Sequence, residues 1–105
     1  MYSEQTPSLK PAQIRHLRAL AHPLRPLVHV GPEGATTELL AAVGQALHDH
    51  ELIKVRMHTP ADKGALSASL ARGSVSTLCG VVGHTAILYR RHPERPKIAV
   101  PAADG

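Results

Sequence analysis

Aromatic residues are nearly absent from this chain. Of its 105 residues, Tyr2 and Tyr89 are the two tyrosines, and there is no phenylalanine or tryptophan. The core must therefore be built from Leu, Val, Ile and Ala. Domains that stack single-stranded bases on aromatic platforms need several aromatic side chains on one sheet. This chain offers only Tyr89 for that purpose, so the sequence argues against that class.

Cysteine and long apolar runs are equally scarce. Cys79 is the one cysteine, so an intramolecular disulfide is impossible and a reducing compartment is expected. No apolar run approaches the roughly 18–20 residues of a membrane span, and residues 1–10 lack the apolar region of a signal peptide. We therefore expect a cytoplasmic protein.

What the chain has is length for one domain and an excess of positive charge. Apolar residues make up 43% of it, which is typical of a globular protein. Between Leu9 and Lys97 there are 12 Lys and Arg residues against six acidic ones, a net charge of +6. This favours a polyanionic partner such as nucleic acid or an anionic membrane. A basic protein without such a partner is the alternative.

Apolar periodicity predicts three helices, at about 11–22, 37–50 and 62–72, and four strands, at 27–30, 51–58, 78–82 and 86–90. The order α-β-α-β-α-β-β predicts an α/β sandwich with a mixed four-stranded sheet. Both β-α-β units should be parallel and right-handed. The last two strands should form a hairpin that adds one antiparallel strand. The strand at 27–30 should be buried.

Two stretches place cations beside an apolar stripe. In the strand at 51–58, Lys54, Arg56 and His58 alternate with the core residues Ile53, Val55 and Met57. In the first helix, Arg15, Arg18 and His22 line one face, next to a buried stripe of Ile14, Leu17, Leu20 and Ala21. Each cationic row is either a binding surface or an ordinary solvated face. Arg90, Arg91, Arg95 and Lys97 form a further basic cluster.

A tight turn, Gly31-Pro32-Glu33-Gly34, joins the first strand to the second helix. Thr36 suits the N-cap of that helix, and such a junction directs backbone N–H groups toward one point, as a phosphate site requires. A plain tight connection is the alternative. The spacing is too short for a P-loop or a dinucleotide fingerprint.

Other chemistry has little support. The eight histidines show no His-x3-His or Cys/His pairing, so we expect no metal site and no cofactor. Cys79 lies within a predicted strand, and no nucleophile elbow is present. An enzyme acting on a phosphorylated small molecule at the glycine turn is a remaining alternative.

Four blocks of the sequence resemble one known family. In chain order they are Leu17-Arg18-Ala19-Leu20-Ala21-His22, Val30-Gly31-Pro32-Glu33-Gly34, His50-Glu51-Leu52-Ile53-Lys54-Val55 and Val82-Gly83-His84-Thr85-Ala86-Ile87-Leu88-Tyr89-Arg90. They resemble the CRM domain (chloroplast RNA splicing and ribosome maturation), in its stand-alone bacterial YhbY-type form. The resemblance covers about residues 9–101.

The resemblance implies a fold similar to the C-terminal domain of translation initiation factor 3. It implies a non-catalytic protein that binds ribosomal RNA in precursors of the large ribosomal subunit and assists assembly, without a membrane or small-molecule partner. Docking on a ribosomal protein is the alternative, and the oligomeric state is left open. The RNA-binding domain should span residues 9–98, between a flexible N-terminus at 1–8 and a flexible tail at 99–105.

The RNA contacts expected from the family's loop and basic surface, together with the neighbouring cations, are Arg15, Arg18, His22, Gly31, Pro32, Glu33, Gly34, Thr36, Lys54, Arg56, Arg90 and Arg91. Pro32 stands where the family often has lysine and removes a backbone donor, while Glu33 adds a negative charge. Lys10 stands where a Ser or Thr cap is usual. The loop should therefore contribute shape and the N–H groups of Gly34, Ala35 and Thr36.

Overall fold

The computed structural model describes residues 9–58 and 60–101, and these residues form three helices and four strands. Residues 1–8 and 102–105, assigned from the sequence to flexible ends, lie outside the described residues. The elements are α1 (Pro11–Ala21), β1 (Val28–Val30), α2 (Thr37–His50), β2 (Leu52–Met57), α3 (Lys63–Ser74), β3 (Thr77–Val82) and β4 (Thr85–Tyr89). This order and the mixed sheet confirm the predicted fold class.

The four strands form one sheet in the order β1-β2-β4-β3. β1 pairs in parallel with β2, and β4 lies antiparallel between β2 and β3. β2 and β3 are therefore parallel to each other although they are not neighbours in the sheet. This agrees with the parallel β-α-β unit predicted for them. The hairpin turn between β3 and β4 contains Gly83, whose φ of 59° is one that glycine adopts without strain.

α2 and α3 cover one face of the sheet. Their core residues Val43, Leu47 and Leu70 are fully buried against the inward side chains of β2 and β4. Ile53, Val55 and Met57 all lie in this core, which confirms the predicted alternation along β2. Apolar burial on this face is the main stabilising contribution to the fold.

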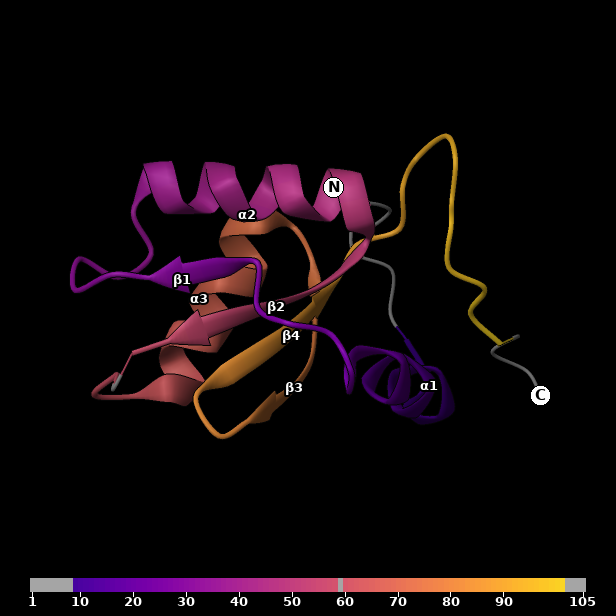
Figure 1. The fold of residues 1–105 in the computed structure, drawn as a ribbon, viewed down its shortest axis with the longest axis horizontal. Helices are drawn as coiled ribbons and strands as arrows, with labels where there is room; N and C mark the ends of the chain where they lie inside the picture. Colours follow the sequence, from indigo (N-terminus) through magenta and orange to yellow (C-terminus); the bar gives the residue numbers. More distant parts are fainter. Residues whose placement is uncertain (1–8, 59, 102–105) are drawn as a thin grey trace.

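α1 packs against the opposite face, where Leu17 and Ala21 contact a separate core of Leu52, Cys79, Ile87 and Tyr89. The prediction for Leu20 was wrong: its side chain is 41% exposed, because α1 buries one narrow stripe against the sheet. Figure 1 shows the arrowheads of β1 and β2 pointing away from α1. His29 of β1 and Arg56 of β2 are exposed, so the helix leaves this end of the face uncovered.

The first strand is less buried than its composition predicts. Leu27 is 51% exposed and lies before the strand, while Val30 is 2% exposed. β1 pairs only with β2, so it is an edge strand. An apolar run of this length cannot distinguish a central strand from an edge strand.

Two helix ends are closed by local hydrogen bonds. Thr36 Oγ1 accepts the N–H of Leu39 at 3.1 Å, which confirms the predicted cap of α2. At the end of α3, Ser76 N donates to Ala71 O at 2.9 Å while Val75 adopts the left-handed conformation. Val75 N also donates to the carbonyls of Ala71 and Arg72, so the last turn of α3 is hydrogen-bonded and the helix ends in a defined cap.

A buried carboxylate holds the C-terminal segment in place. Glu51, at the end of α2, is 0% exposed. Its carboxylate accepts the backbone N–H groups of His92 at 2.6 Å, Lys97 at 2.7 Å and Ile98 at 2.8 Å. Desolvation raises the pKa of Glu51, but these N–H donors outweigh it and leave the pKa below its ordinary value. The segment is thus anchored to the start of β2.

The chain beyond Ile98 then returns to α1 (Figure 1). Gln13 Nε2 donates to Pro101 O at 2.8 Å, and the ring of His16 bonds to Ala99 O at 3.0 Å. The sequence assigned residues 99–101 to a flexible tail, whereas the structure packs them beside α1. The reason is that Gln13 and His16 supply polar partners that the tail's own composition does not reveal.

Candidate functional site

The uncovered half of the α1 side of the sheet carries the predicted cationic row. Lys54, Arg56 and His58 point to this side because Ile53, Val55 and Met57 fill the core behind them. His29 of β1 lies opposite Arg56 in the register and adds an imidazole to the row. We call these four residues, with Arg18 and His22 of α1, the cationic face. Arg15 is exposed on the side of α1 that faces away from the buried Leu17.

Lys54 links the strand to the helix. Its Nζ donates to His22 O at 3.0 Å, at the C-terminal end of α1. An ammonium group there satisfies a carbonyl that the helix leaves unbonded and complements the helix dipole. Lys54 therefore has a structural role and also brings its charge next to His22.

Arg18 lies across the backbone of β3 at Gly80. A Cβ atom added at Gly80 would lie 3.1 Å from Arg18 Nε and 3.5 Å from Arg18 Cζ. The β3–β4 register shifts between Leu78 and Gly80, which indicates a β-bulge at this point. The missing side chain at Gly80 leaves the space that the Arg18 side chain occupies.

A hollow of about 560 Å³ lies between α1 and the sheet on the cationic face. Its polar lining consists of Arg18, His22 and Lys54, and its apolar lining consists of Val82, Ile87 and Ala19. No carboxylate is among these lining residues. A cationic rim with an apolar floor suits an anionic ligand that also carries an apolar or planar part.

His29 and His58 form a pair at the far end of the cationic face. Their Nδ1 and Nε2 atoms are 3.2 Å apart, and the rings stack with centroids 5.4 Å apart. This pair lies where β1 and β2 end. It connects the cationic face to the glycine turn that follows β1.

The glycine turn has the predicted shape but not all of the predicted donors. Gly34 N donates to Gly31 O at 3.1 Å, and Thr36 N donates to Gly34 O at 2.9 Å. Two of the three N–H groups expected to face a ligand are therefore used inside the turn. The expectation was wrong for these two, because a turn this short satisfies its own backbone groups. Gly34 has a φ of 79°, which explains the glycine.

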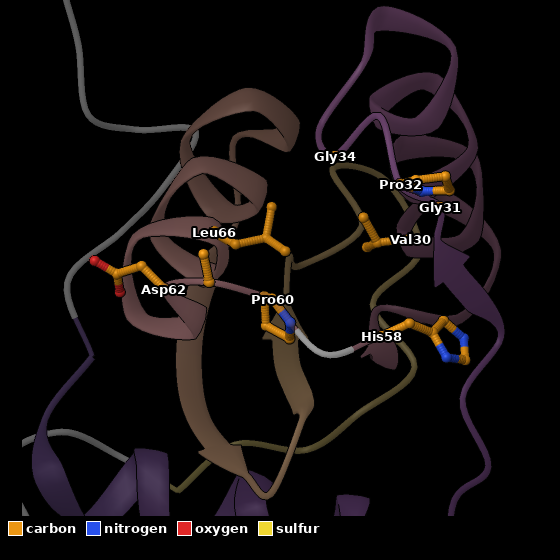
Figure 2. A pocket seen from close by; sticks show the side chains of 9 residues that line it. Val30, Gly31, Pro32, Gly34, His58, Pro60, Asp62 and Leu66 are labelled. Carbon is orange, nitrogen blue, oxygen red and sulfur yellow. The ribbon is translucent and has the colours of Figure 1, made fainter.

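A second hollow, of about 460 Å³, lies between this turn and the β2–α3 connection. Figure 2 shows Val30 and Leu66 pointing into it from opposite sides, with Pro32 and Pro60 beside them. Pro60 and Leu66 were not predicted as site residues. The signal was available: β1 and β2 are neighbouring parallel strands, and connections after the carboxyl ends of such strands lie side by side.

The charge around the turn differs from that of the cationic face. No Lys or Arg is among the residues that line the second hollow, and Asp62 is one of them. Glu33 and Glu38 lie on the turn and on the first turn of α2. The residues that line the hollow of the cationic face therefore carry more positive charge than those around the turn.

Arg90 and Arg91 were also predicted as RNA contacts, but they are not part of the cationic face. Arg90 Nη1 donates to Ser74 O at 2.6 Å and Nη2 donates to Gly44 O at 2.9 Å. Burial lowers the pKa of Arg90 from its ordinary value. Arg90 thus ties α2 to α3 on the other side of the sheet, while Arg91 is exposed.

Other chemical groups add little to this site. Cys79 is buried, and burial raises the pKa of its thiol to about 11 although Arg18 opposes the shift. Among residues 9–58 and 60–101, no three His, Cys, Asp or Glu side chains come together as a metal site would require. No helix in that part of the chain has the length and apolar character to cross a membrane.

The fold and the site define a small α/β domain with one cationic face that spans a helix and the open half of a sheet. Comparison with known proteins shows the family to which this domain belongs. Residues 9–90 match the CRS1 / YhbY (CRM) domain family. The chain belongs to this family.

Named relatives and a solved structure agree with the assignment. The chain is 35% identical over 91 residues to the Bacillus subtilis protein named "Probable RNA-binding protein YqeI", covering 85% of this chain and 95% of the relative. It is 36% identical over 97 residues to a Haemophilus influenzae protein named "RNA-binding protein", covering 90% and 96%. A solution structure of a Staphylococcus aureus protein, described as a candidate RNA-binding protein, superposes with a TM-score of 0.78 at 31% identity, covering 90% of this chain and 100% of that chain.

Proposed function

We propose that this protein is a non-catalytic RNA-binding protein that binds ribosomal RNA in precursors of the large ribosomal subunit and assists their assembly in the cytoplasm. The cationic face carries the proposal. It gathers Arg18, Lys54 and Arg56 from α1 and β2 onto one surface, and no carboxylate is among the lining residues of its hollow. The names of the relatives support RNA as the partner.

The cationic face, rather than the glycine turn, supplies most of the attraction. The turn uses two of its N–H groups internally and lies near Glu33, Glu38 and Asp62. Binding to phosphates through the cationic face should depend on salt, with a slope in log K against log salt of about −0.7 to −0.9 for each phosphate neutralised.

Charge reversal on the cationic face tests this assignment. Arg18→Glu and Arg56→Glu should each weaken binding of ribosomal RNA fragments roughly tenfold at low salt, measured by fluorescence anisotropy, with the effect shrinking as salt rises. Lys54 is a poorer choice, because its substitution also removes the bond to the end of α1. Arg72→Glu makes the same charge change on exposed Arg72 of α3, across the sheet, and serves as the matched control.

Equal weakening by Arg72→Glu would show that net charge alone matters and would refute the cationic face. The cellular role needs a separate experiment, in which tagged protein is sedimented through a ribosome gradient after RNA crosslinking. We expect it to follow large-subunit precursors with direct crosslinks to their RNA. Co-sedimentation with few crosslinks would indicate docking on a ribosomal protein. A melting shift with nucleotides but none with RNA would indicate a small-molecule site.

A further inference from the structure

The hollow between α1 and the β3–β4 hairpin has features that phosphate binding alone does not require. Val82 lines it and is 58% exposed, more than Leu20, Leu24 or Leu27. An exposed valine among Arg18, His22 and Lys54 adds nothing to the attraction of a phosphate. It does favour a ligand that brings an apolar surface together with its charge.

An unpaired nucleotide has this combination of properties. Its phosphate is anionic and its base presents a flat, weakly polar face, whereas a paired base in a duplex has both faces covered by its neighbours. Proteins bind splayed bases on aromatic rings or on Arg guanidinium groups. Arg18 is exposed and lies at the edge of this hollow, so it can play the second role.

We propose, building on the RNA-binding function, that this hollow accepts one unpaired nucleotide. Its base lies between the Arg18 guanidinium and Val82, and its phosphate meets Lys54. The Lys54 ammonium donates one bond to His22 O and carries two further N–H donors for an anion. Charge complementarity selects this occupant, because the lining residues include two cations, a histidine and no acid.

Gly80 is a positioning residue for this site. Even an alanine Cβ would lie 3.1 Å from Arg18 Nε, so Arg18 would have to shift by a few tenths of an ångström, and a valine would displace it further. The φ of Gly80 is not in the left-handed region, so the backbone accepts another residue. Position 80 therefore favours glycine because a larger side chain would occupy the space that Arg18 fills.

The test compares a perfect RNA duplex with the same duplex carrying a one-nucleotide bulge. We expect the wild-type protein to bind the bulged RNA about fivefold more tightly by anisotropy, near the lower end of what stacking one base contributes. Val82→Ser should reduce this ratio to about 1, while binding of the perfect duplex changes less than about twofold. Gly80→Val should also reduce the ratio, and because it displaces Arg18 it should weaken binding of both RNAs. Gly44→Ala, at a glycine where an added Cβ would meet no other atom of the described residues within 4 Å, is the matched control and should keep the ratio.

The outcomes separate this inference from the function on which it rests. Equal wild-type affinity for the two RNAs, or an unchanged ratio in Val82→Ser, would overturn the nucleotide site while leaving RNA binding intact. Binding to neither RNA would overturn both. Circular dichroism and melting of each variant establish that it is folded before affinities are compared.

Discussion

The buried carboxylate of Glu51 allows a quantitative test of how the C-terminal segment is held. Glu51→Gln replaces one carboxylate oxygen by an NH₂ group. Oε1 accepts Lys97 N and Ile98 N, and Oε2 accepts His92 N, so in either orientation the new NH₂ group faces at least one backbone N–H. Rotating the side-chain amide therefore does not restore all three bonds.

The expected cost follows from those contacts. Losing one charge-assisted hydrogen bond and leaving a buried donor unsatisfied costs about 2–4 kcal/mol in the free energy of unfolding. For a domain of this size the melting temperature should fall by on the order of 10–30 °C. Urea and thermal unfolding followed by circular dichroism measure both quantities. Glu94→Gln, at an exposed carboxylate in the same segment, is the control and should stay within about 0.5 kcal/mol.

The pH dependence supplies a second readout. Because the pKa of Glu51 is lowered in the folded protein, its stabilisation is present above the unfolded pKa of about 4.3 and is lost as pH falls through the lower folded value. The stability difference between wild type and Glu51→Gln should therefore narrow below about pH 4. A Glu51→Gln protein within about 0.5 kcal/mol of wild type at neutral pH would refute the anchoring role.

Two further predictions concern side chains whose roles the structure changed or sharpened. Arg90→Met should destabilise the fold by about 1–3 kcal/mol in urea unfolding, because the carbonyls of Ser74 and Gly44 lose the guanidinium donor. It should change RNA affinity less than about twofold. Arg91→Met is the exposed control, and a tenfold loss of affinity in folded Arg90→Met would contradict the structural role. Cys79, with its thiol pKa raised to about 11, should react with iodoacetamide at pH 8 at least tenfold more slowly in the native protein than in urea, measured by mass spectrometry, and equal rates would contradict its burial.

Local sequence patterns were sufficient to predict the orientation of the β2 side chains, the cap of α2 and the glycine turn. The alternation of Ile53, Val55 and Met57 with Lys54 and Arg56 determines which side chains of β2 face the core, because a strand repeats every two residues. The cap at Thr36 and the turn at the two glycines follow from equally local rules. Length, charge and the four sequence blocks pointed to the family.

The tertiary structure decided how those pieces meet. β4 enters between β2 and β3, which puts Ile87 beside Lys54, and α1 takes the face opposite α2 and α3. These long-range pairings create the hollow at Arg18, because residues distant in sequence line it together. They also place Arg90 where it bonds to both α2 and α3, and they make Glu51 the anchor of the C-terminal segment. The sequence shows which side chains are charged, but only the packing determines whether a charged group faces solvent or forms a hydrogen bond with a backbone carbonyl.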